Sequence, residues 1–158
     1  MWAERLCGRR EYCPYDLRLK LKARGVTPNE AERLIKMLVQ HDFLNEERYV
    51  RAFIHDKSKL QGWGPQKIRF ALCAKQIPDT LVREALEGVD ADAQKETLRR
   101  LLTTKIRSLK ADSLEDLRTK LMRFGLGRGF SYQDVTLEVS LLTKVKHDAL
   151  TAAEHVGG

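Results

Sequence analysis

The sequence predicts an all-α protein built from three tandem three-helix repeats that form an elongated, curved array. Three observations predict this fold class. Apolar residues recur at helical spacing along most of the chain, no segment alternates apolar and polar residues as a half-buried strand does, and a helix-ending motif occurs three times at nearly constant spacing. A chain of 158 residues has the length of one domain or of a short repeat array.

Start signals divide the helical pattern into nine expected helices. The clearest is the stretch 27–30, where Thr27 and Glu30 form a capping box and Pro28 occupies the first helical position, at which its missing N–H has no cost. Further starts are marked by Pro14, Asn45, Pro65 and Ser113. The expected helices cover residues 2–9, 14–24, 28–41, 46–60, 65–75, 79–87, 92–109, 113–127 and 132–144. Residues 146–158 are expected to form a frayed or disordered tail.

A short motif is expected to end the middle helix of each repeat. It consists of a basic residue, usually a glycine, and an apolar residue, and its copies lie 51 and then 53 residues apart: Arg24-Gly25-Val26, Lys75-Gln76-Ile77 and Arg128-Gly129-Phe130. Glycine is preferred in the left-handed conformation that closes many helices, so Gln76 is expected to strain or reshape the second copy. The three repeats are assigned to residues 1–44, 45–90 and 91–145.

Core positions recur at fixed distances from this motif. Eight residues before its middle position stand Leu17, Ile68 and Leu121, four before it stand Leu21, Leu72 and Gly125, and six after it stand Ala31, Val82 and Val135. The third repeat has a rival register, because residues 116–121 resemble residues 16–21. We prefer the register set by the glycine, since it needs no gap in the turn that follows.

Basic residues are segregated from acidic ones along the chain. Eighteen of the 29 Lys and Arg lie in four windows, 17–29, 57–78, 97–111 and 117–133, which contain none of the 22 Asp and Glu. A solvated helix surface usually mixes the two signs. The segregation and the net charge of +7 therefore indicate a surface that binds a polyanion. A membrane partner is not expected, because no run of about 18 apolar residues exists.

Cations of these windows are the candidate residues for binding a partner or DNA. They are Arg24, Lys57, Lys59, Lys67, Arg69, Lys75, Arg99, Lys105, Arg107, Lys110, Arg118, Arg123 and Arg128. Arg24, Lys75 and Arg128 also fit a structural role, because cations in a last helical turn stabilise the helix dipole. Arg99, Arg107 and Lys110 favour binding, since local electrostatics does not account for them as a group.

Enzyme chemistry has little support in the sequence. It contains neither the GxxxxGK[ST] phosphate-binding loop nor the HExxH zinc motif, and its four His do not combine with Cys at a zinc spacing, so no cofactor or metal is expected. Cys7, Cys13 and Cys73 are too few and too irregular for a disulfide framework, and the first two are expected to be buried. Reduced thiols and a charged N-terminal segment favour a cytoplasmic protein, expected to be a monomer.

Two stretches resemble the RecX regulatory family. The first runs from Phe43 to Ile54 and continues through Gly64-Pro65-Gln66-Lys67-Ile68 to Leu72, and the second is Arg128-Gly129-Phe130-Ser131-Tyr132. The resemblance covers about residues 5–140 and implies three-helix repeats. It also implies a non-catalytic modulator that lies in the groove of the RecA–DNA filament and restrains ATP hydrolysis and strand exchange in recombination, DNA repair and the SOS response. The short first helix and Gln76 depart from the family pattern.

Other functions remain open at the level of sequence. The main alternative is a stand-alone nucleic-acid-binding protein of helix-turn-helix type, which trihelical units with basic helices would allow. Against it, the basic residues are spread over four windows, whereas a groove-reading protein concentrates them on one recognition helix. A scaffold that bridges acidic partners is a more distant alternative.

Overall fold

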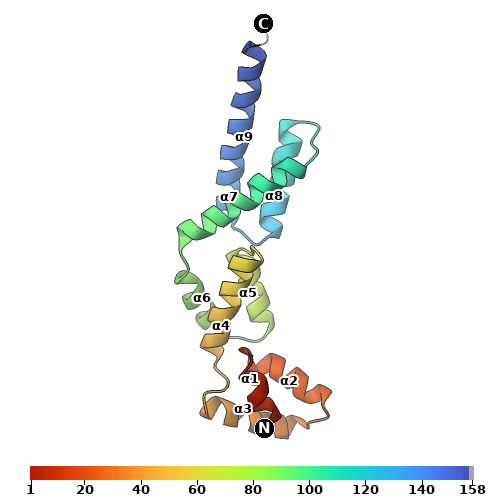
Figure 1. The fold of residues 1–158 in the computed structure, drawn as a ribbon, viewed down its shortest axis with the longest axis vertical. Coiled ribbons are helices and arrows are strands. Elements are labelled where there is room, and N and C mark those ends of the chain that lie inside the picture. Colours follow the sequence, from red (N-terminus) through yellow and green to blue (C-terminus); the bar gives the residue numbers. More distant parts are fainter. Residues whose placement is uncertain (157–158) are drawn as a thin grey trace. The chain divides into compact units, whose positions relative to one another are not determined.

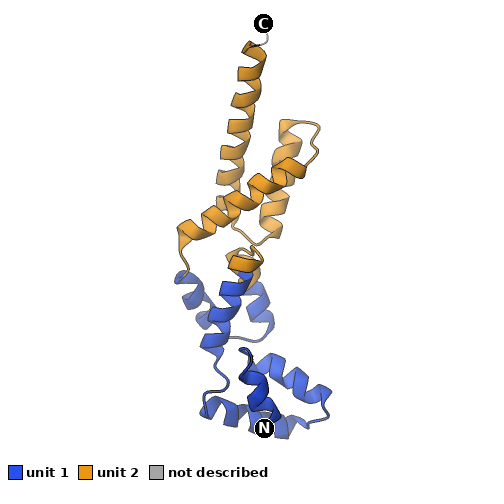
Figure 2. Ribbon diagram, in the orientation of Figure 1, with its two compact units in different colours: residues 1–57, 69–88 blue, residues 58–68, 89–158 orange. Residues whose placement is uncertain are grey.

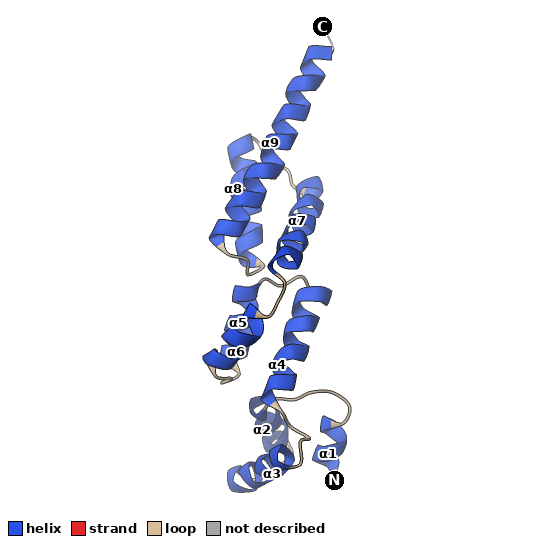
Figure 3. Cartoon of the chain, turned by 90° about the vertical axis from the view of Figure 1, so that its left-hand side faces the viewer, coloured by secondary structure: helices blue, strands red, loops and turns tan. Residues whose placement is uncertain are grey.

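A computed structural model describes residues 1–156, and every regular element in this part of the chain is helical (Figure 1). The elements are α1 (Trp2–Cys7), α2 (Pro14–Ala23), α3 (Pro28–Gln40), α4 (Glu46–His55), the π-helical turn η1 (Asp56–Leu60), α5 (Pro65–Ala74), α6 (Asp79–Glu87), α7 (Ala91–Ser108), α8 (Leu114–Gly127) and α9 (Tyr132–Val156). Figure 3 shows no strand in the described residues, which confirms the all-α prediction. None of these helices is long and apolar enough to cross a membrane.

The chain divides into two compact units, coloured separately in Figure 2. Unit 1 comprises residues 1–57 and 69–88, and unit 2 comprises residues 58–68 and 89–158. In unit 1, α2 packs on α3 and α4 packs on α6. In unit 2, α7, α8 and α9 pack on one another around a core of Leu98, Leu102, Leu117, Leu121, Phe130, Val135 and Val139. The repeat boundaries at 44, 90 and 145 stay a prediction.

The predicted N-terminal caps are present. Thr27 and Glu30 form both bonds of the capping box at the start of α3. The Asn45 side chain accepts from the Arg48 N–H, and the Ser113 side chain accepts from the Asp116 N–H. These bonds satisfy amide groups that a helix leaves free at its beginning, so that the helix starts are fixed by local sequence.

The helix-ending motif closes all three middle helices in the same way. The N–H of its central residue donates to the carbonyl three residues earlier, and the N–H of its apolar residue donates to the carbonyl five residues earlier. The central residues have positive φ angles: 79° at Gly25, 60° at Gln76 and 93° at Gly129. This repeated hydrogen-bonding pattern satisfies the last carbonyls of each helix and confirms the motif as the repeat anchor.

The anchor also supports the glycine register in the third repeat. Gly125 occupies the position of Leu21 and Leu72 and is buried like them. A Cβ atom on Gly125 would lie 2.7 Å from Cγ1 of Val135, which stands where the first repeat has Ala31. The first repeat pairs leucine with alanine, the second leucine with valine, and the third glycine with valine, so Gly125 leaves the room that Val135 occupies.

The last helix is longer than predicted. Helix α9 continues to Val156, whereas the sequence analysis ended it at 144 and expected a frayed or disordered tail over residues 146–158. Residues 146–156 contain no Gly or Pro and include Ala149, Leu150, Ala152 and Ala153. Their intrinsic preference extends the helix even though their side chains are exposed. Residues 157 and 158, which the same expectation covered, lie outside the described residues.

The fourth expected helix, over 46–60, changes its character before its end. α4 stops at His55, and residues 56–60 form the π-helical turn η1. Such turns are rare and are frequently found at functional sites. Here the turn leads into Gln61 and Gly62, which lie in the connection to α5.

Replacing Gln76 with glycine is expected to stabilise the protein by about 0.5–1 kcal/mol. A non-glycine residue in the left-handed region costs about 1–2 kcal/mol, and the greater freedom of glycine in the unfolded chain offsets part of the gain. Urea unfolding followed by circular dichroism would measure the change. Gln76→Ala is the control, because it keeps a Cβ and should leave the midpoint almost unchanged. A lower urea midpoint for Gln76→Gly than for the unchanged protein would show that the left-handed backbone at Gln76 is not strained.

Candidate functional site

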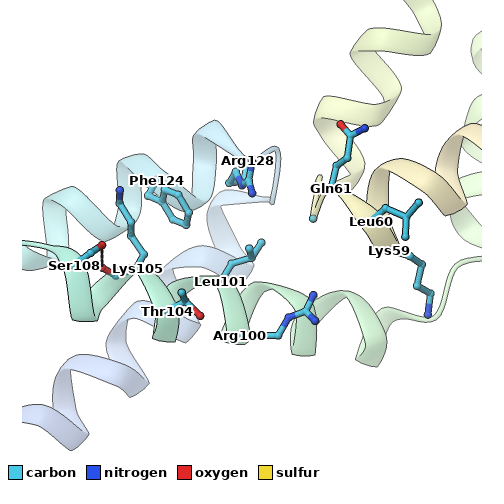
Figure 4. Close-up of a pocket in the computed structure, with 11 residues that line it drawn as sticks. Lys59, Leu60, Gln61, Arg100, Leu101, Thr104, Lys105, Ser108, Phe124 and Arg128 are labelled. Carbon is cyan, nitrogen blue, oxygen red and sulfur yellow. Dashed lines mark hydrogen bonds between the residues drawn. The ribbon is translucent and has the colours of Figure 1, made fainter.

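A basic hollow of about 390 Å³ lies in unit 2, where α7, the end of α8 and residues 59–62 meet (Figure 4). Its cations are Lys59, Arg100, Lys105 and Arg128, and its lining contains no acidic residue. Leu60, Leu101 and Phe124 form the apolar part of the wall, and Thr104 and Ser108 add hydroxyl groups. We call this site the basic hollow.

Residues 59–62 comprise the end of η1 and the tight turn that follows it, and they form one side of the hollow. Gly62 has a φ of 65°, and a Cβ atom there would lie 3.2 Å from Cδ1 of Leu101. Glycine therefore meets two requirements at once, the left-handed backbone and the close approach to α7. The turn brings Lys59 and Leu60 to the wall of the hollow.

A close crossing of two backbone segments fixes the backbone at Arg128. The Gly64 N–H donates to the Arg128 carbonyl at 2.7 Å, and the Gln66 N–H donates to the Gly129 carbonyl at 2.9 Å. A Cβ atom on Gly64 would lie 2.3 Å from the carbonyl carbon of Gly129, and one on Gly129 would lie 2.3 Å from Cβ of Lys67. We call this contact the glycine crossing. It gives amide groups at the start of α5 their partners.

Two cations of the hollow lie over one aromatic ring. The Lys105 ammonium is 5.1 Å from the centre of the Phe124 ring, and the Arg128 guanidinium carbon is 5.8 Å from it. Cation–π attraction restricts both side chains to positions at the hollow. The Nε atom of Arg128 is buried and has no hydrogen-bond partner among the described residues. Buried donors normally have partners, so that Arg128 stands out as a group that lacks an acceptor.

The structure brings three of the predicted binding residues together in the hollow: Lys59, Lys105 and Arg128. Arg100, the fourth cation, was missed by the sequence analysis, although it lies in the window 97–111. Arg100, Thr104 and Ser108 follow one another at intervals of four residues on α7 and all line the hollow. That spacing of a cation and two hydroxyls on one helix face is the signal that could have identified Arg100.

Three other predicted residues are engaged in ion pairs within their own unit. Arg69 binds Asp79 through two nitrogens at 2.8 and 2.9 Å, and this bonding lowers the pKa of the Asp79 carboxyl. Lys75 binds both carboxylate oxygens of Asp16 at 2.8 and 2.7 Å. In unit 2, Arg99 donates two bonds of 3.1 Å to Glu138.

Arg99 has ion-pair partners that the sequence analysis did not consider, and its predicted role in binding stays a prediction. Arg99 was grouped with cations that local electrostatics does not explain, but it pairs with Glu96, three residues earlier, at 3.3 Å and with Glu138, 39 residues later, at 3.1 Å. The Glu138 side chain is only 4% exposed. A buried carboxylate needs a counter-ion, so that Arg99 has a structural role in joining α7 to α9.

The remaining predicted residues are dispersed over both units. Arg24 lies 4.0 Å above the Trp2 ring, Lys57 lies 5.4 Å from Phe53, and Lys67 lies 4.4 Å from Trp63. The Arg118 Nε–H donates to Oγ1 of Thr143 at 3.2 Å. The side chains of Arg107, Lys110 and Arg123 are exposed and have no ion-pair partner in the described part of unit 2.

The cysteines are all unpaired. Cys7 and Cys13 are buried, as predicted, and Cys73 is exposed. Burial raises the pKa of the Cys7 and Cys13 thiols. Residues 1–156 contain no group of three metal-ligating side chains that could hold a metal ion.

These features define an all-helical repeat protein with a basic hollow whose lining contains four cations and no acidic residue. Family models describe the second and third three-helix domains of RecX, and they match residues 45–86 and 92–136 of this chain. The chain belongs to the RecX family of regulatory proteins.

Named relatives agree with this assignment. Regulatory protein RecX of Haemophilus ducreyi (strain 35000HP / ATCC 700724) is 36% identical over 125 residues, which are 79% of this chain and 80% of that protein. Regulatory protein RecX of Clostridium perfringens (strain 13 / Type A) is 30% identical over 130 residues, 81% of this chain and 60% of that protein. The chain thus spans little more than half the length of some relatives, since it covers 55% of the protein from Clostridium botulinum (strain Eklund 17B / Type B).

Solved structures show the same fold. The crystal structure of RecX from Lactobacillus salivarius superposes with a TM-score of 0.76 at 21% identity, over 89% of this chain and 91% of that one. A second crystal structure, of a regulatory protein RecX, gives a TM-score of 0.77 at 19% identity over 84% of this chain and 66% of that one.

Replacing Gly129 with alanine is expected to destabilise the protein far more than replacing Gly25. Both glycines have positive φ, but a Cβ atom on Gly25 would meet nothing within 4 Å. Gly25→Ala should cost about 1 kcal/mol for backbone conformation, and Gly129→Ala about 1–3 kcal/mol more for the collision at the glycine crossing. Urea unfolding compares the two variants directly. If both variants lose the same free energy of unfolding, the two backbone segments of the glycine crossing move apart at no energetic cost.

Replacing Arg99 with glutamine is expected to lower the melting temperature by several degrees, because it leaves the buried Glu138 carboxylate without its cation. Arg107→Gln removes the same charge from the exposed side of α7 and should leave the melting temperature nearly unchanged. Differential scanning calorimetry of the two variants tests the assignment. The ion pair has no structural role if they melt together.

Proposed function

We propose that this protein binds the RecA–DNA filament and restrains RecA ATP hydrolysis and strand exchange without catalysing a reaction itself. The observation that carries the proposal is the basic hollow, with four cations and no acidic residue, in a chain of the RecX family. A RecA–DNA filament presents DNA phosphates and acidic side chains over a long surface. Cations that lack internal counter-ions are suited to bind such a surface, since binding releases its condensed counter-ions.

Further cations of unit 2 support the proposal. Arg107, Lys110 and Arg123 are exposed and lie outside the hollow. Each contact of such a residue with a phosphate or carboxylate is weak, because both groups are solvated. Several contacts made at the same time add up to useful affinity and make it strongly dependent on salt.

A stand-alone reader of duplex DNA is the competing function. Such a protein places the N-terminal residues of one recognition helix against base edges in the major groove. The cations of the basic hollow instead come from three segments, η1, α7 and the end of α8. This distribution suits contacts with a charged backbone better than contacts with base edges.

The protein is expected to inhibit the DNA-dependent ATPase of the cognate RecA at concentrations well below those that bind bare duplex DNA. The double variant Arg100→Gln, Lys105→Gln should require about ten times more protein for the same inhibition, which corresponds to about 1.4 kcal/mol of lost binding. Lys95→Gln is the matched control, because Lys95 is an exposed cation of α7 outside the hollow. It should inhibit like the unchanged protein.

Two outcomes would contradict the proposal. If the unchanged protein has no effect on RecA and binds duplex DNA at nanomolar concentration with sequence preference, it is a stand-alone DNA reader. If the double variant and the Lys95→Gln control inhibit equally, the basic hollow does not contribute to the effect. Circular dichroism of each variant checks that the helices remain folded.

A further inference from the structure

We infer that the basic hollow binds the phosphodiester backbone of a single nucleic-acid strand, with Arg128 as its central contact. The inference rests on the proposed function and goes further, because it states which component of the filament the hollow contacts. That component is the DNA strand, and not an acidic surface of RecA.

The state of Arg128 is the first observation. Its guanidinium has no acidic partner in the described residues, and its Nε atom is buried without an acceptor. The glycine crossing fixes its backbone, and the Phe124 ring lies against its side chain. The fold therefore holds a charged donor group at the hollow without neutralising it. An anion that supplies oxygen acceptors would complete the site, as phosphates do with arginine.

The distribution of charge around Arg128 is the second observation. Lys59, Arg100 and Lys105 line the hollow from two further segments (Figure 4), and its lining contains no acidic side chain. Arg100 and Lys105 are five residues apart on α7, which is about 7.5 Å along the helix axis. A carboxylate side chain brings one charge, whereas a nucleic-acid strand brings a charge at every nucleotide. Several separated cations therefore match a strand better than a single acidic residue.

The apolar wall is the third observation. Leu60 is 76% exposed, and with Leu101 it forms an aliphatic surface beside the cations. Base faces that could pack on this surface are accessible in a single strand and stacked away in a duplex. The volume of about 390 Å³ lies near the lower end of small-ligand sites, which suits one nucleotide unit. Lys105 and Arg128 lie over the Phe124 ring, so this ring is not expected to stack on a base. The expected contacts are then mainly with phosphates, and the base sequence should matter little.

The experiment measures binding of the full chain to a fluorescent single strand of twenty thymidines over a range of salt concentrations, without RecA. Arg100→Gln and Arg128→Gln should each weaken binding by about tenfold and lower the slope of log K against log salt by about 0.7, the value for one lost phosphate contact to a single strand. Lys95→Gln, with the same change of net charge, should stay within about twofold in affinity and keep its slope.

Leu60→Ser tests the apolar wall separately. Leu60 is largely exposed, so that the change should not affect folding. It should weaken single-strand binding several-fold and leave the salt slope unchanged, because no phosphate contact is lost. A duplex of the same length should bind more weakly than the single strand and should be insensitive to Leu60→Ser.

Competition with thymidine monophosphate and with inorganic phosphate distinguishes a strand from a free ligand. Both should displace the strand only at concentrations far above that of the strand's own phosphates. A free nucleotide that competes equally well per phosphate would overturn the inference in favour of a small-molecule site. Arg128→Gln is accompanied by a thermal melt, and Arg100→Gln, at an exposed position, keeps the test valid if Arg128→Gln fails to fold.

The outcomes separate this inference from the proposed function. If Arg100→Gln and Arg128→Gln bind the strand like Lys95→Gln but lose ATPase inhibition, the hollow contacts RecA, and the inference fails while the proposed function stands. If the salt slopes fall as expected but the unchanged protein does not affect RecA, the strand site is supported and the proposed function fails.

Discussion

The glycine crossing is the constraint on which the candidate site depends. Two hydrogen bonds join the start of α5 to the end of α8, and they form only because Gly64 and Gly129 have no side chains. The same contact sets the backbone of Arg128, a cation of the hollow whose Nε atom is buried. A polar backbone contact thus determines where a functional charge lies. Without it, the cations of α7 would face solvent as an ordinary basic helix surface.

Much of the fold was predictable because its determinants are local. Capping residues such as Thr27 and Asn45 and the anchor at Gly25 act on neighbouring backbone groups, so that the sequence alone indicates where helices begin and end. The end of α9 was not predicted, because no side chain from residue 144 to residue 156 is buried and nothing in the packing of the described part of unit 2 requires the helix to continue. Helix preference alone extends it to Val156.

The candidate site was predictable only in part. The acid-free windows correctly indicated unneutralised charge at Lys105 and Arg128, but they also included Arg99, whose partner Glu138 comes from a distant helix. Ion pairs between different helices depend on tertiary packing and cannot be recognised from the spacing of residues in the sequence. The hollow itself depends on the turn at Gly62 and the crossing at Gly64. The need for glycine at both positions could not be predicted, because it arises from close contacts with residues that are distant in the sequence.

The C-terminal half of α9 differs physically from the rest of the chain. From residue 144 to residue 156 every side chain is exposed, whereas Val135, Glu138, Val139 and Thr143 are buried earlier in the same helix. Isolated helices of this length are only marginally stable in water, because no packing offsets the entropy of ordering them. Amide hydrogens after residue 144 should therefore exchange with deuterium much faster than those between 132 and 143. The helix then contains two segments of different local stability, and the boundary between them is set by where its contact with α7 and α8 ends.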